Sequence, residues 1–153
     1  MALEFNTIGV KLKYAVETSA GTRPESGYTQ IPDIKSTPAI DINPNKLEVT
    51  NLEDQYRRYV DGVKDVGDSF DFTANLTADL KSKWVSCVSA AQSAWASSKA
   101  TWFEICIPNF DSFYFAGIPG ELGVNEMSVD AVIESTLHIV PNKIAGWATA
   151  SST

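Results

Sequence analysis

The side chains that could do chemistry are few and scattered in this sequence. His138 is its one histidine, and Cys87 and Cys106 lack C-x-x-C spacing. One histidine and two separated cysteines provide neither the four ligands of a structural zinc site nor the three of a catalytic one. The G-x-S-x-G, G-x-x-x-x-G-K-[ST] and H-E-x-x-H patterns are absent. We therefore predict that the protein has no catalytic, cofactor-binding or metal-binding residues and is not an enzyme.

The carboxylates Asp61, Asp65, Asp68 and Asp71 form the only acidic series. They lack the D-x-D-x-D-G spacing of a calcium loop and extend from a predicted loop into a predicted strand. A solvated negative surface is the favoured interpretation. An enzyme with an unfamiliar carboxylate site between Asp61 and Asp71 is a weaker alternative.

Composition limits the class of protein further. The chain has 153 residues, of which 44% are hydrophobic, so it suits one domain with a sizeable core. A formal net charge of -7 argues against a domain that grips nucleic-acid phosphates. The apolar runs are far shorter than the roughly 20 residues of a membrane span, and the N-terminus lacks a signal-peptide pattern. We expect a soluble protein without membrane insertion, made in the cytosol, with free thiols.

Apolar and polar residues alternate with the period of a β-strand over several segments. Pro32 restricts one of them to an edge or bulged strand. We expect a single domain, 1–153, with flexible ends at 1–6 and 141–153. The predicted strands cover 8–16, 30–34, 46–50, 68–76, 101–108, 112–118 and 128–140.

One helix is predicted over residues 78–98, with Thr77 as its N-cap and Asp79 in its first turn. Runs of strands with a single inserted helix favour a mainly β fold: an antiparallel β-sandwich or barrel with one flanking helix. The expected core stripe of the helix is Leu80, Trp84, Val88, Ala91 and Trp95.

The opposite face of this helix carries small hydroxyl side chains where Lys and Glu are usual. Such a face permits close approach of another surface, and Ser86 and Ser93 are our candidate contact residues. A Ser-rich face exposed to solvent is the equal alternative. The stripe comprises Ser82, Ser86, Ser89, Ser93 and Ser97.

Residues 51–67 show no clear helical or strand period and predict a loop of unusual length. Tyr56, Tyr59, Val60 and Val63 indicate that this segment buries itself against something. A partner chain and the edge of its own domain are both open at this point.

The amino-acid sequences of these segments, and their order along the chain, resemble those of the tail tube, or major tail, proteins of long-tailed bacteriophages. The likeness runs from Asn6 to about Asn142. It is carried by NTIGVKLKYAVET, AGTRP, GYTQIPDI, LEVT, KDVGDSFDFTANLT, TWFEICIP, FYFAGIPGELG and the segment from Val129.

This resemblance implies a structural subunit of a hollow tube. Members of the family close into rings, usually hexameric, and the rings stack around a tape measure protein. The tube ends at tail terminator and distal tail or baseplate proteins, and it later conducts the genome into the host. The implied location is the virion tail, assembled in the host cytoplasm, with no cofactor.

The resemblance also suggests which residues make contact between subunits. The family's long loop locks neighbouring subunits or rings together, so Tyr56, Arg57, Arg58, Tyr59 and Val63 are the expected joint. Arg57 and Arg58 are expected to pair with acidic residues across it, which would make assembly sensitive to salt.

A tube that lets DNA slide needs a lumen that does not hold phosphates, which suits an acidic chain. The polar sides of two alternating strands are the expected lining, and simple exposure on the outer surface is the close alternative. These residues are Asp71, Thr73, Asn75, Glu134 and Thr136.

A function of another class stays open. A monomeric β-sandwich binding module would use the aromatic segment to hold a glycan or a peptide. It predicts a pocket around Tyr56 and Tyr59 and a monomer at every concentration.

Overall fold

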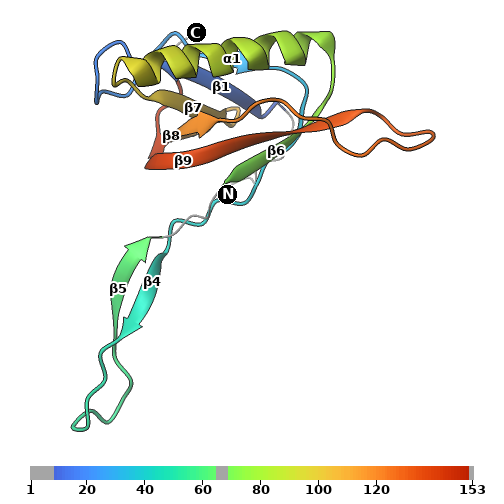
Figure 1. The fold of residues 1–153 in the computed structure, drawn as a ribbon. Coiled ribbons are helices and arrows are strands. Elements are labelled where there is room, and N and C mark those ends of the chain that lie inside the picture. Colours follow the sequence, from blue (N-terminus) through green and yellow to red (C-terminus); the bar gives the residue numbers. More distant parts are fainter. Residues whose placement is uncertain (1–8, 65–68, 152–153) are drawn as a thin grey trace. The chain divides into compact units, whose positions relative to one another are not determined.

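The computed structural model describes residues 9–64 and 69–151, and the chain divides into two compact units (Figure 1). The larger comprises Met1–Pro38 and Ser69–Thr153, and the smaller is Ala39–Asp68. The predicted flexible N-terminus, residues 1–6, lies outside the described residues.

The larger unit is built on an antiparallel, nearly closed sheet of seven strands with one helix beside it, which confirms the predicted mainly β fold. The strand order is β2-β1-β7-β8-β9-β6-β3. The strands are β1 (Lys11–Val16), β2 (Thr29–Ile31), β3 (Ile34–Ser36), β6 (Phe70–Asn75), β7 (Thr101–Cys106), β8 (Ser112–Pro119) and β9 (Glu134–Ala148).

The two edges of the sheet are joined by only two residues, Pro32 and Asp33. Strand β2 pairs with β1, whereas β3 pairs with β6 at the other end of the sheet. Asp33 has a φ of 62° and accepts a 3.0 Å hydrogen bond from the Asn75 amide at its carbonyl. The proline interrupts the extended segment as predicted, and the chain crosses there from one edge to the other.

An aromatic cluster centred on Phe115 fills the interior of the sheet. Its ring centroid lies 5.0 Å from that of Phe70, 5.5 Å from that of Phe103 and 6.4 Å from that of Phe72. All four side chains are fully buried. The alternation seen in the sequence therefore places one parity of β6, β7 and β8 in a common core.

Helix α1 (Ala78–Ala96) covers part of this core. The Thr77 hydroxyl accepts a 3.1 Å hydrogen bond from the Leu80 amide, confirming the predicted N-cap. The Trp84 indole donates to the Gly120 carbonyl at 2.9 Å. Trp95, which we assigned to the core stripe, is 63% exposed, so that assignment was wrong. The buried helix residues are Leu80, Trp84, Cys87 and Ala94.

The other face of the sheet holds a smaller cluster, with Trp102, Tyr114 and the carboxylate of Glu104 all buried. Ser151 binds this carboxylate twice, through its amide at 3.0 Å and its hydroxyl at 2.6 Å. The Tyr114 hydroxyl lies 2.9 Å from Glu104 and 2.7 Å from the Thr149 carbonyl. The C-terminal segment is thus tied to the sheet up to Ser151.

The expectation of a loose segment from residue 141 onward was wrong up to Ala148, because β9 continues through Pro141. The proline is tolerated because it faces Gly117 at a register shift in the β8–β9 ladder, where a missing N–H costs little. Conversely, residues 128–133, predicted as strand, precede β9.

The smaller unit is a hairpin of β4 (Pro44–Glu48) and β5 (Tyr59–Lys64). The prediction of a loop over 51–67 was therefore wrong for 59–64, while 65–67 lie outside the described residues. Neither strand buries a face, so no alternating pattern was required to form this ladder.

No helix in the described ranges has the length and hydropathy needed to cross a membrane.

Replacing Phe115 by Ala is expected to lower the free energy of unfolding of the unassembled chain by about 3–5 kcal/mol, because it removes the ring that the other three contact. Chemical denaturation measures this change. Tyr56→Ala removes an aromatic ring that is 81% exposed and should stay within about 0.5 kcal/mol of wild type. Equal effects would contradict the assignment of the core.

Glu104→Gln should loosen the C-terminal segment and lower the stability by about 1–3 kcal/mol, since a buried acceptor of charge-assisted hydrogen bonds is lost. Burial raises the pKa of Glu104, but hydrogen bonds from Ser151 and Tyr114 outweigh it, and the pKa lies below its ordinary 4.5. The carboxylate therefore stabilises the fold above that pH, and the contribution is lost as the pH falls through the folded-state value.

Hydrogen exchange of the Ser151 amide measures this loosening and should accelerate in Glu104→Gln. The matched control is Glu48→Gln, on an exposed position of β4. Unchanged exchange at Ser151 would show that the carboxylate does not hold the segment.

Candidate assembly surfaces

The residues predicted to line a lumen come together on one face of β6 and β9. The buried residues of these strands alternate with them and point into the core, so the polar set faces outward from the core. Whether this shared face lines a lumen stays a prediction. The directly opposed pairs are Asp71 with His138, Thr73 with Thr136 and Asn75 with Glu134.

Hydrogen bonds and an ion pair connect the side chains of this polar face. Asp71 Oδ1 lies 2.6 Å from His138 Nδ1 and accepts a 2.7 Å hydrogen bond from the Ser69 hydroxyl. These bonds, that from Ser69 first, hold the pKa of Asp71 below its ordinary 3.8. Lys35 of β3 forms an ion pair with Glu134. The face is wettable and carries both signs of charge, with its acidic groups largely engaged.

The hairpin of the smaller unit presents apolar side chains with little cover in their own unit. Tyr56 is 81% exposed and Val63 is 83% exposed, and Tyr59 and Val60 are also exposed. A monomer rarely displays so many large apolar side chains on so few residues without a partner for them. The predicted contact residues of this segment are therefore available in the isolated chain.

The arginines of the hairpin differ from each other. The Arg58 guanidinium lies 3.3 Å from Asp54 in the same hairpin, so it already has a partner of the kind we expected across a joint. Arg57 is exposed. Of the two, Arg57 is the better candidate for an ion pair with another subunit.

The serine stripe of α1 is exposed along its whole length, as the sequence suggested. Ser86 donates a 3.0 Å hydrogen bond to the Ser82 carbonyl, which turns its hydroxyl back onto the helix. Ser93 is exposed as well. A backbone from another molecule could approach this face closely.

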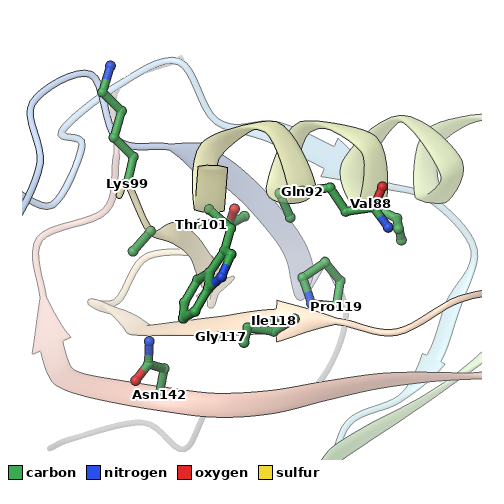
Figure 2. A pocket seen from close by; sticks show the side chains of 11 residues that line it. Val88, Gln92, Lys99, Thr101, Gly117, Ile118, Pro119 and Asn142 are labelled. Atoms are coloured by element: carbon green, nitrogen blue, oxygen red, sulfur yellow. The ribbon is translucent and has the colours of Figure 1, made fainter. Parts of the chain in front are cut away.

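A groove of about 390 Å³ runs between the C-terminal half of α1 and strands β8 and β9 (Figure 2). Sequence reasoning missed it, because the periodicity that suggested a core position for Trp95 does not show how closely the helix packs against the strands beside it. The groove lies along α1 rather than around Tyr56 and Tyr59, where a binding module would need it. Its lining residues are Val88, Ala91, Gln92, Trp95, Lys99, Ala100, Thr101, Gly117, Ile118, Pro119 and Asn142.

The acidic series does not form a site among the residues described. Asp61 forms an ion pair with Lys46, Asp71 contacts His138, and Asp65 and Asp68 lie outside the described ranges. Within those ranges no group of three or more His, Cys, Asp or Glu could hold a metal ion. Both cysteines are free, as predicted, and burial raises the pKa of Cys87 to about 12.

Comparison with known proteins finds similarity in structure alone. No protein-family model matches the sequence, and a search of curated proteins finds no match. A chain in the tail of an empty gene transfer agent (GTA) particle, refined helically with C6 symmetry, superposes with a TM-score of 0.58 at 16% identity. That superposition covers 97% of this chain and 100% of the other.

Two further structures agree. A chain in the virion of a native GTA particle gives a TM-score of 0.60 at 15% identity, covering 95% of this chain and 100% of that one. A chain in the sixfold-symmetrised baseplate of the anti-feeding prophage (AFP) gives 0.57 at 8% identity, covering 95% and 97%. The chain shares the fold of these tail, virion and baseplate chains.

Removing the hydroxyl of Ser69 should raise the pKa of Asp71 toward 3.8, because that hydrogen bond is the largest of the effects that lower it. His138→Ala should raise it as well, because the His138 ring also lowers this pKa through its hydrogen bond to the carboxylate. NMR titration of the Asp71 carboxyl measures both. Ser151→Ala, which alters the Glu104 cluster instead, is the control. An unchanged Asp71 pKa in both variants would contradict the described geometry.

Proposed function

We propose that this chain is a structural subunit of a phage tail tube, which closes into rings of six that stack into a hollow conduit for the genome. Support for the proposal comes first from the structural similarity, which extends over at least 95% of this chain in all three comparisons. Two of those structures have sixfold symmetry. The segment resemblance in the sequence points independently to the tail tube family.

The sheet offers an edge for a neighbouring subunit. Among the described residues, strand β9 pairs with β6 up to Ile139, and its later pairs are with β8. In the proposed tube, the outer edge of residues 140–148 accepts a strand from the next subunit, so that the sheets of a ring join. The polar face of β6 and β9 then lines the lumen.

The electrostatics of this face suit a conduit. This face presents carboxylates and hydroxyls to DNA, from Asp71, Glu134, Thr73 and Thr136. The nearby cation Lys35 is already paired with Glu134. A net charge of -7 for the chain adds like-charge repulsion. DNA passes such a wall without specific binding.

The hairpin and the helix face supply the other joints. In the proposal, Tyr56, Tyr59 and Val63 pack against the neighbouring ring, and Arg57 provides a salt-sensitive contact there. The serine stripe of α1 receives another surface at close range. The remaining partners are a tape measure protein inside the tube, and terminator and distal tail or baseplate proteins at its ends. The tube is part of the virion, is assembled in the host cytoplasm and needs no cofactor or catalysis.

Ser86→Lys combined with Ser93→Lys should leave the fold intact and block assembly, because two long charged side chains would be forced into a close contact. Sedimentation velocity across a wide concentration range measures assembly, and circular dichroism checks folding. The control, Ser19→Lys with Ala20→Lys, adds the same charge at exposed loop positions. Normal assembly of the helix variant would mean that this face is turned to solvent.

A further inference from the structure

The segment between β8 and β9 projects from the larger unit (Figure 1). Several of its apolar side chains are exposed. We call residues 124–133 the arm. Val129 is 90% exposed, and Met127 and Val132 are exposed to 61% and 67%. Asp130 adopts a φ of 59°, which makes the turn at the tip. These side chains have little cover in their own chain, which marks them as an interaction site.

The base of the arm is fixed, so the tip is presented on a firm support. The Asn125 amide donates to the Glu134 carbonyl at 3.1 Å, and its side chain accepts a 3.0 Å hydrogen bond from Thr136. The Ser135 hydroxyl donates to the Gly123 carbonyl at 2.8 Å. An arm held in this way loses less conformational freedom on binding than a slack loop would.

The groove beside Trp95 is complementary to the arm in polarity and in charge. Most of its lining is apolar, and Trp95 and Ile118 are exposed there. Its one formally charged lining residue is Lys99, at the end of the groove (Figure 2). The arm carries the opposite charge in Glu126 and Asp130. The chain as a whole has a net charge of -7, so much of its surface repels an acidic arm. A groove that lacks carboxylates is therefore a selective site for the arm.

The arm and the groove lie toward opposite ends of the larger unit. The groove is lined by the C-terminal half of α1, whereas the arm extends past the end at which α1 begins (Figure 1). A contact between a surface at one end and a different surface at the other end is heterologous, and such a contact closes into a ring if the rotation between subunits permits.

From this complementarity, we infer that the arm of one subunit docks into the Trp95 groove of a second copy of the chain and forms the head-to-tail joint within a ring. Val129 and Val132 enter the groove against Trp95 and Ile118, and Asp130 approaches Lys99. The inference rests on the proposed function, in which copies of this chain form closed rings.

Two variants test the joint separately. Val129→Glu with Val132→Glu blocks the arm, and Trp95→Glu blocks the groove. Each should weaken association at least roughly tenfold, as expected for the centre of an interface. Glu is used in both so that the two blocked surfaces repel each other. All three positions are exposed, so folding should be retained, and circular dichroism verifies this.

Mixing the two variants gives the decisive readout in sedimentation velocity. At a concentration where the wild type associates and a tenfold weaker joint does not, each variant alone should stay monomeric. An equimolar mixture should form dimers and no rings there, because it contains one intact arm and one intact groove per pair. Ser19→Glu with Ala20→Glu, the control for added charge, should assemble as wild type does.

The outcomes separate the two claims. Ring formation by the wild type and by either blocked variant would overturn the arm joint and leave the tube proposal standing. Wild-type protein that stays monomeric at every concentration would overturn the tube proposal and the joint together. Dimers confined to the mixture would establish the joint.

Discussion

The larger unit depends on one short covalent link, the two residues that carry the chain from one edge of the sheet to the other. With Pro32 and Asp33 between them, β2 must pair at one end of the sheet and β3 at the other, so the sheet has to curl until those ends meet. Asp33 then fixes the helix as well, since its carboxylate accepts a 2.6 Å hydrogen bond from the N-cap residue Thr77. Curvature of the sheet and placement of α1 are set at one point.

The surfaces left by this closure differ in polarity. The interior is filled by aromatic rings, which leaves the polar sides of β6 and β9 on a separate, wettable face. Large apolar side chains are instead displayed on the hairpin, on the arm and beside Trp95. A soluble monomer gains nothing from this distribution, because each exposed apolar group favours association. In the proposed ring, neighbouring subunits would cover these groups.

Several elements could be predicted from sequence because they bury a face. Strand β6 was evident because one side of it packs in the core, and α1 because Leu80 and Trp84 repeat at helical spacing. Strand β1 was evident from its alternating residues, although residues on both of its sides are buried. Strand β5 was missed because neither of its faces is buried, whereas its partner β4 was predicted in part from the β-forming residues at 46–50. The continuation of β9 past Pro141 was missed because proline argues against a strand unless a register shift accommodates it.

The candidate surfaces could be anticipated only in part. Cross-strand register follows from pairing, so the residues predicted to line a lumen lie together on one face. Local ion pairs do not follow from composition, and Arg58 proved to be engaged by Asp54. The groove beside Trp95 depends on how α1 packs beside β8 and β9, which is a property of the packed structure and has no signature in the sequence.

Electron microscopy of the purified wild-type chain, over a concentration range that extends as high as its solubility allows, tests the central claim most directly. The account predicts hollow rings or tubes with sixfold symmetry and a central channel. Only isolated particles of monomer size at the highest concentration would contradict it.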